Sequence, residues 1–152
     1  MLFLLCEVDR ERYALDAGQI AEVLPIVHIQ RAPQSPPEVA GLVNYRGVPV
    51  PVVDLSTLLH GRPSALRLSS RVVILKWTDA RGATQLLGVV AEHAVQTIRR
   101  DPADFVASGI GDGRAAATVA SAGEGSLIQW LDVPALLPAS LRDTLLAASE
   151  IA

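Results

Sequence analysis

The hydrophobic positions of this chain fall in short runs that are rich in β-branched residues and end at turn-forming residues. The clearest runs are Leu2–Val8, Val72–Trp77, Leu86–Ala91 and Leu127–Leu131. Runs of this length and composition are typical of strands, whereas long stretches with helical periodicity are rare in this sequence. The pattern predicts an all-β fold of about ten short strands with few helices, arranged as a barrel or as paired barrels.

Several shorter segments carry weaker signals. Apolar residues at helical spacing predict a short helix from Gly18 to Leu24, before Pro25. A strand is predicted over Ile26–Ile29. Near the end of the chain, Ser140 and the acid three residues later resemble a capping box, which predicts a C-terminal helix to about residue 149.

The segment between residues 41 and 55 is the most informative. Asn44–Gly47 consists of turn residues and predicts a tight hairpin connection. The strand that follows carries Pro49 and Pro51, so two successive donors are missing along one of its edges. A central strand does not tolerate this loss, and we therefore expect the segment at a sheet edge or barrel seam, where the prolines discourage strand addition.

A helix is predicted directly after this strand. Asp54 is placed to cap a helix over Leu55–His60, and Gly61 is placed to end it. The next residues, 61–70, are polar and contain a proline. We expect the boundary between two lobes of a single domain in this loop.

Composition and charge narrow the function. The chain has 152 residues, half of them apolar, and a formal net charge of −3 without a basic stripe that would track nucleic acid. Its single cysteine, Cys6, lies in an apolar run and is expected to be a buried thiol in a reducing compartment. No signal peptide or membrane-spanning segment is evident. A cytoplasmic location is therefore predicted.

No group of residues predicts catalysis, a metal or a cofactor. The glycine-rich loop at 109–113 lacks the lysine and following helix of a phosphate-binding loop, and a nucleophile-elbow motif is absent. Asp54 is accounted for as a helix cap. The remaining candidates for such chemistry are widely spaced: His28, His60, His93, Glu22 and Glu92. We therefore predict that the protein is not an enzyme.

The segment that carries the predicted hairpin resembles the signature of the CheW-like family of chemosensory adaptors. The matching residues are Gly41-Leu42-Val43-Asn44-Tyr45-Arg46-Gly47 and Val50-Pro51-Val52-Val53-Asp54-Leu55, and only Tyr45 departs from the pattern, at a position where leucine is usual. Weaker matches upstream and downstream extend the resemblance over nearly the whole chain.

The resemblance implies two five-stranded SH3-like barrels that share an apolar core. It also implies an adaptor that couples the cytoplasmic tips of chemoreceptors to the regulatory domain of a CheA-type histidine kinase, recruited to receptor arrays at the inner membrane face. The residues that the resemblance places at the receptor contact are Ile20, Gly41, Asn44, Arg46 and Arg71. Those that it marks as structural are Gly47, Pro51 and Asp54.

Alternatives remain at this point. Asn44 equally fits a structural role in its own turn. For Arg46 the alternative is a solvated hairpin side chain, and the resemblance favours a partner contact. A ligand-binding sensor on the same fold would require a deep apolar pocket with converging polar groups. A hydrolase would require a carboxylate and a histidine brought together by the fold.

Overall fold

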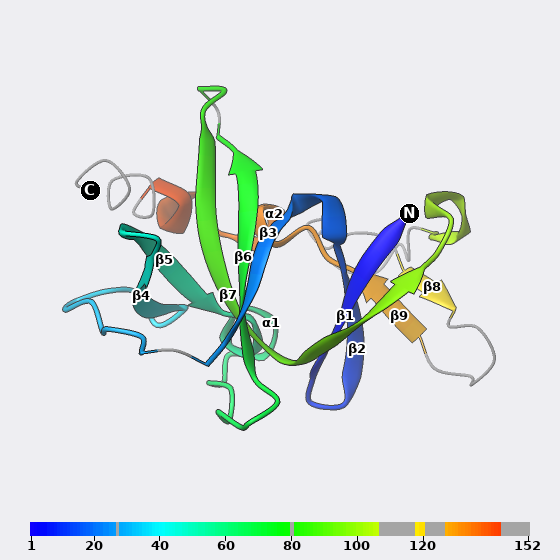
Figure 1. Ribbon diagram of the computed structural model, residues 1–152, viewed down its shortest axis with the longest axis horizontal. Coiled ribbons are helices and arrows are strands. Elements are labelled where there is room, and N and C mark those ends of the chain that lie inside the picture. The colour runs from blue at the N-terminus through cyan, green and yellow to red at the C-terminus, as the bar shows by residue number, and fades with distance from the viewer. Residues whose placement is uncertain (27, 80, 107–117, 121–126, 144–152) are drawn as a thin grey trace.

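The computed structural model describes residues 1–26, 28–79, 81–106, 118–120 and 127–143 (Figure 1). The strands are β1 (Leu2–Val8), β2 (Glu11–Asp16), β3 (Ile20–Pro25), β4 (Val39–Tyr45), β5 (Val48–Asp54), β6 (Arg71–Thr78), β7 (Thr84–Arg99), β8 (Thr118–Ala120) and β9 (Leu127–Trp130). The helices are α1 (Leu55–His60) and α2 (Val133–Leu136), with 3-10 turns at η1 (Ala17–Gln19) and η2 (Pro102–Asp104). The all-β prediction is confirmed.

The strands form two groups that share the long strand β7. In one group β7 pairs through its first half with β6 and β5, and β3 and β4 complete the set. In the other group its second half pairs with β1, followed by β2, β9 and β8. Figure 1 shows β7 running from one half of the molecule into the other. Counted with β7 in both, each group has five of the described strands, the number that the family resemblance implied.

Along a strand that is buried on both faces, successive side chains point alternately into two different cores. On β6, Val72 and Ile74 face the interior of the first group, whereas Val73 and Leu75 face a core shared by both groups. All four side chains are at most 3% exposed. A strand buried on both faces reads as a continuous apolar run, which explains why this segment shows no polar alternation.

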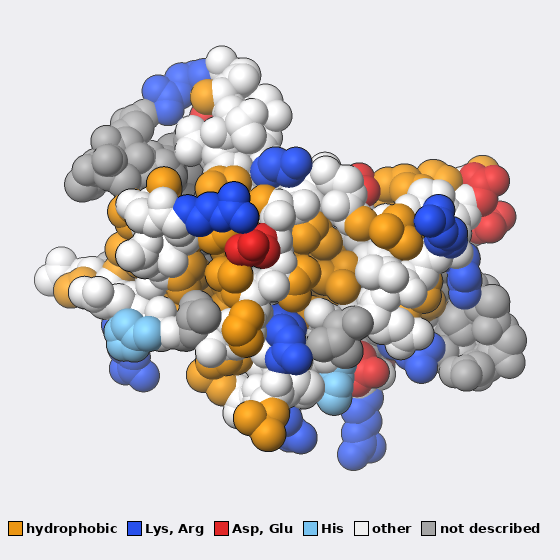
Figure 2. All heavy atoms as spheres, in the orientation of Figure 1, with side chains coloured by type: hydrophobic (Ala, Val, Ile, Leu, Met, Phe, Trp, Pro, Cys, Tyr) orange, Lys and Arg blue, Asp and Glu red, His pale blue; other side chains and the backbone are white. Residues whose placement is uncertain are grey.

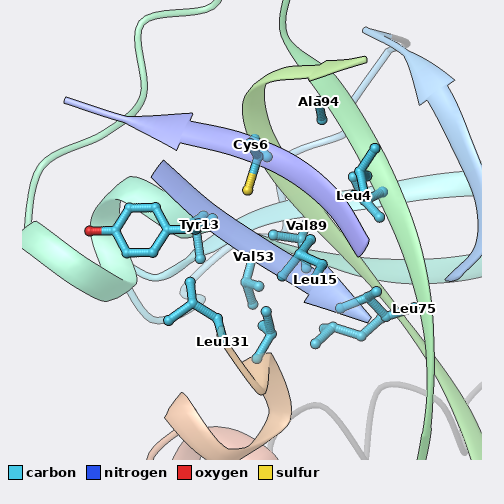
Figure 3. Packing of buried hydrophobic residues seen from close by; sticks show 14 of the residues in the cluster. Leu4, Cys6, Tyr13, Leu15, Val53, Leu75, Val89, Ala94 and Leu131 are labelled. Carbon is cyan, nitrogen blue, oxygen red and sulfur yellow. The ribbon is translucent and has the colours of Figure 1, made fainter. Parts of the chain in front are cut away.

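The shared core joins the two groups into one unit. Figure 3 shows Leu4 and Cys6 of β1, Val53 of β5 and Leu75 of β6 converging there, with Leu131 before α2 packed against them. The second group has its own smaller core, in which the rings of Phe3, Phe105 and Trp130 lie 5.1–5.2 Å apart. Aromatic rings at this spacing and tilted to one another attract beyond the area they bury.

The hairpin and helix predictions for residues 44–61 are confirmed. The turn between β4 and β5 contains two residues, Arg46 and Gly47. Pairing between β5 and β7 begins only at Val52, so the part of β5 that holds Pro49 and Pro51 pairs with β4 alone. The prolines therefore lie on an edge, as their missing donors required.

Two local predictions between residues 18 and 29 are wrong. The segment expected to be a helix is the turn η1 followed by strand β3, in which a register shift separates Ile20 from Glu22. A bulged strand leaves apolar residues at a spacing that a helix also produces. The expected strand over Ile26–Ile29 is not formed by residues 26, 28 and 29, which are its described residues; after Pro25 the next β contact in the described chain is a bridge between Gln30 and Leu42.

Predictions for the loops and the C-terminus need two corrections. Residues 61–70 join α1 to β6, and because β5 and β6 both pair with the first half of β7, the division between the two groups does not fall in this loop. The last helix begins at residue 139 with the Pro138 carbonyl accepting from Arg142 N–H, so Ser140 lies inside its first turn rather than at its cap. The predicted end of this helix and the loop 109–113 lie outside the described residues.

Candidate functional site

The hairpin between β4 and β5 has the geometry of a tight two-residue turn. Arg46 and Gly47 have φ angles of 52° and 83°, which is the left-handed region that a type I′ turn requires at both central positions. Asn44 stabilises the turn, since its Oδ1 accepts a hydrogen bond of 2.8 Å from Gly47 N–H. Asn44 therefore has the structural role that its sequence position allowed, and a receptor contact through it stays a prediction.

The side chain of Arg46 projects from this turn into solvent, and it is 74% exposed. Its Nη2 lies 3.4 Å from Glu22 Oε1 on β3, and its guanidinium lies 5.2 Å from the ring centroid of Tyr45. Two partly exposed apolar side chains flank these groups in sequence: Val23 is 37% exposed and Val48 is 47% exposed. We call Glu22, Val23, Arg46 and Val48 the hairpin edge.

Glu22 is a residue that the sequence did not assign to the site. Its partner Arg46 lies 24 residues away, and no local pattern predicts that pairing. Ile20 lies two residues before Glu22 on β3, where it is partly buried against the shared core. Ile20 pairs with Leu75, which faces the shared core, whereas Glu22 pairs with Ile74, which faces the core of the first group, so the bulge between them turns Ile20 away from the face of Glu22.

Gly41 and Arg71 make contacts within their own chain. Gly41 has a φ of 146°, and a Cβ atom at this position would lie 2.1 Å from the carbonyl oxygen of Gln30. The close backbone approach that this glycine permits is therefore the approach of β4 to residue 30. Arg71 Nη1 donates to the carbonyls of Leu68 and Ser70, at 2.6 and 2.8 Å.

Arg71 is also separated from Ile20 along the sheet. It faces Pro25 at one end of the β3–β6 ladder, whereas Ile20 faces Leu75 at the other. Four residues of strand correspond to about 13 Å. The structure therefore separates Arg71 from Ile20, and a receptor contact through Arg71 stays a prediction.

Asp54 accepts more hydrogen bonds than a helix cap alone requires. Its Oδ1 accepts from Ser56 N–H at 2.9 Å, which caps α1. The same carboxylate accepts from the Ser64 hydroxyl at 2.6 Å and from Ser64 N–H at 2.9 Å. Asp54 therefore fixes the loop after α1 as well as the start of the helix, a role that its sequence position did not reveal.

A surface pocket of about 660 Å³ lies beside this carboxylate, lined by residues of the 28–40 segment, of α1 and of the loop after it. Its polar groups are largely committed: Asp54 and Ser64 bond each other, and the Ser35 hydroxyl donates to the Ala32 carbonyl at 2.8 Å. His28, Arg31 and Thr57 also line this open surface pocket, which is not the deep apolar pocket that a ligand sensor needs, and the ligand-sensor alternative is not supported.

Candidate catalytic pairs are equally weak. Asp9 and His60 do approach each other, but their Oδ2 and Nε2 atoms are 3.9 Å apart, beyond hydrogen-bond reach, and both side chains are partly exposed. Asp9 binds Arg62 instead, at 2.7 Å, which links the β1–β2 turn to the end of α1. Among the described residues, no three histidine, cysteine or acidic side chains are grouped as a metal site requires.

Two buried groups have shifted pKa values that suit structural roles. Burial raises the pKa of the Cys6 thiol to about 12, with the nearby Glu7 adding to the shift, so the thiol stays protonated and unreactive. The pKa of Asp79 is lowered, mainly by the hydrogen bond from Gln85 and further by N–H donors of Ala83 and Arg81. Asp79 closes the turn between β6 and β7.

Comparisons with known proteins agree with this fold. The family model of the CheW-like domain matches residues 2–140. The crystal structure of the scaffolding protein TtCheW from Thermoanaerobacter tengcongensis superposes with a TM-score of 0.78, covering 92% of this chain and 89% of that one at 19% identity. No match was found among curated protein sequences. In the described part of the chain, no helix is long and apolar enough to cross a membrane. The chain belongs to the CheW-like family, a family of scaffolding adaptors in chemotaxis signalling rather than of enzymes.

Proposed function

We propose that this protein couples the cytoplasmic tips of chemoreceptors to the regulatory domain of a CheA-type histidine kinase. It acts in the cytoplasm, recruited to receptor arrays at the inner membrane face. The receptor tip docks on the hairpin edge, with Arg46 as the principal contact, and Ile20 contributes apolar surface from the same strand as Glu22. A separate surface binds the kinase domain.

The observation that carries this proposal is the conformation of Arg46. A type I′ turn favours Asn or Gly at its first central position, because a side chain with a Cβ is strained at positive φ. Arg46 occupies that position at a φ of 52°, and its side chain is 74% exposed. The fold gains little from an arginine here. A residue that lowers stability and makes no strong contact within the fold supports a role in binding.

The surroundings of Arg46 fit a helical partner. A receptor tip is an amphipathic helical hairpin, and it presents apolar side chains beside carboxylates and helix-end carbonyls. The planar guanidinium of Arg46 can donate two parallel hydrogen bonds to such oxygens. The Glu22 carboxylate lies 3.4 Å from the guanidinium in a solvent-exposed ion pair. Such an ion pair is weak, so a carboxylate of the partner can replace Glu22 readily.

Isothermal titration calorimetry tests the proposal. The protein is titrated with the kinase regulatory domain and, separately, with a receptor-tip fragment. We expect binding to both, and Arg46→Ala should weaken the receptor interaction about ten-fold, or about 1.4 kcal/mol, while leaving kinase binding unchanged.

Arg62→Ala is the matched control, because the Arg62 side chain is 70% exposed and also pairs with one acid, Asp9. It should leave the receptor interaction unaltered. Absence of binding to both partners by the unmodified protein would overturn the proposed function, and equal losses in the two variants would overturn the assignment of the hairpin edge.

A further inference from the structure

The loop between α1 and β6, residues 61–70, is held in place by hydrogen bonds along its whole length. Asp54 binds both polar groups of Ser64, as described above. Further on, Arg67 N–H donates to the Ser70 hydroxyl at 2.9 Å, and Ser70 N–H donates to the Arg67 carbonyl at 3.0 Å. Ser70 is completely buried. These hydrogen bonds therefore hold the loop in a defined conformation.

Two contacts from other elements complete this arrangement. Arg71 Nη1 donates to the Leu68 carbonyl at 2.6 Å. His93 N–H donates to the Ser69 carbonyl at 3.1 Å, from a point on β7 where the backbone has a φ of 52°. The backbone around Leu68 is thus anchored from two directions.

Two leucine side chains of this anchored loop are exposed to solvent. Leu66 is 61% exposed and Leu68 is fully exposed. Single exposed leucines are common on protein surfaces and need no explanation. Here two of them stand on a loop that is bonded at both ends, and Leu66 also lines the pocket of about 660 Å³. Exposed apolar side chains beside a concave surface mark a protein-binding site.

Two arginines at or beside the pocket are available to a partner. Arg31 lines it and Arg67 follows Leu66 in the loop, and neither guanidinium has a hydrogen-bond or ion-pair partner among the residues that the structure describes. The only acid among the described lining residues is Asp54, whose oxygens accept from Ser56 and Ser64. Figure 2 shows hydrophobic and basic side chains side by side at the lower end of the molecule, where Figure 1 places this loop.

We infer that the loop 61–70 and the adjoining pocket form a second docking surface, which binds an amphipathic protein segment with an apolar face flanked by carboxylates. Leu66 and Leu68 contact the apolar face, and Arg31 and Arg67 pair with the flanking acids. A lipid surface cannot enter a concave pocket, so the pocket favours a protein segment. This inference is independent of the receptor contact proposed for Arg46.

The test uses two synthetic 16-residue peptides, each with leucines at helical spacing. One carries glutamates beside the leucine stripe and the other carries lysines at the same positions. Each is titrated into the isotopically labelled full chain, and amide chemical shifts are followed by NMR. We expect the acidic peptide to bind, with shifts concentrated at residues 28–40 and 61–70. The lysine peptide should bind at least about ten-fold more weakly.

Three variants sharpen the result. Leu66→Ser combined with Leu68→Ser should weaken the acidic peptide at least about ten-fold without changing the fold, since both side chains are exposed. Arg31→Glu combined with Arg67→Glu should reverse the preference toward the lysine peptide. Leu127→Ser is the matched control, because this leucine is 56% exposed on β9 and lies outside both proposed surfaces, and it should leave acidic-peptide binding unchanged.

Several outcomes would overturn the inference. These are no binding of either peptide, equal binding of both, an acidic peptide that is insensitive to the leucine changes, and shifts confined to the hairpin edge. Co-sedimentation with vesicles of anionic lipid that depends on Leu68, together with no acidic-peptide binding, would instead assign the loop to a membrane surface.

Discussion

The two ends of β5 are built in opposite ways. At its C-terminal end, Asp54 accepts hydrogen bonds from Ser56 and Ser64, so its carboxylate is used within the chain. At its N-terminal end, Arg46 occupies a turn position that suits glycine better, and its charge has one weak, exposed partner. The seven-residue strand β5 thus ends in a residue that stabilises the fold and follows a turn residue that lowers its stability.

This contrast divides the family signature by role. Gly41, Asn44 and Asp54 each have a contact inside the molecule that accounts for the residue type. Arg46 has none of comparable strength. A signature segment can therefore consist mainly of residues that build a scaffold and of very few that reach a partner. Substitutions at the two kinds of position should separate cleanly into changes of stability and changes of binding.

The largest effect is expected at Gly41. Gly41→Ala places a Cβ atom within 2.1 Å of the Gln30 carbonyl oxygen, at a φ that strains any side chain. The approach is to backbone, which has no easy way to move, so we expect a loss of about 3 kcal/mol or more in the free energy of unfolding. Urea denaturation measures it. Gly47→Ala, where no atom lies within 4 Å of the added Cβ, is the control and should cost less.

The second effect is expected at the structural end of β5. Asp54→Ala removes the cap of α1 and leaves two donors of Ser64 without their acceptor. We expect it to lower the free energy of unfolding by about 2 kcal/mol. Ser64→Ala keeps the cap and should recover part of this loss in the same urea measurement. Equal stability of Asp54→Ala and the unmodified protein would contradict the structural role.

A third effect depends on pH. Because the folded-state pKa of Asp79 lies below the ordinary carboxyl value, its contribution to stability is present above that ordinary value, near pH 4. The contribution is lost as pH falls from there through the folded-state pKa. Asp79→Asn should therefore reduce the fall in melting temperature between pH 5 and pH 2.5, as measured by circular dichroism. An unchanged fall would show that Asp79 is not the group responsible.

The smallest effect on stability, and the most telling, is expected at the other end of β5. Arg46→Gly relieves the positive φ and should raise the free energy of unfolding by up to about 1 kcal/mol. The same change should weaken receptor-tip binding. A variant that is less stable, or that binds as well as the unmodified protein, would break the contrast between the two ends of the strand.

The sequence was informative wherever a feature depends on neighbouring residues. The apolar runs located β1 and β6, the turn residues located the hairpin, and Asp54 located the start of α1. Each of these signals acts over a few residues, through strand burial, turn geometry or capping. The same locality explains why the buried state of Cys6 followed from the run in which it lies.

Features that join distant segments were not predictable in the same way. Strand β7 belongs to both groups because β6 pairs with its first half and β1 with its second half. The sequence of β7 contains no pattern that predicts this pairing. The apolar spacing at residues 20–24 fits a helical turn as well as a bulged strand, and the pairing with β6 decided between them. The contacts Arg46–Glu22 and Asp54–Ser64 likewise join residues 24 and 10 apart in sequence.

The central claim is that one molecule of this protein binds receptor and kinase at the same time. The most direct measurement mixes it with a receptor-tip fragment and the kinase regulatory domain, and follows complex size by analytical ultracentrifugation. We predict a ternary complex with the unmodified protein, and a complex with the kinase domain alone when Arg46→Ala is used at concentrations below its weakened receptor affinity. If the two partners displace each other, so that only binary complexes form, the protein is not a coupling adaptor and the account is wrong.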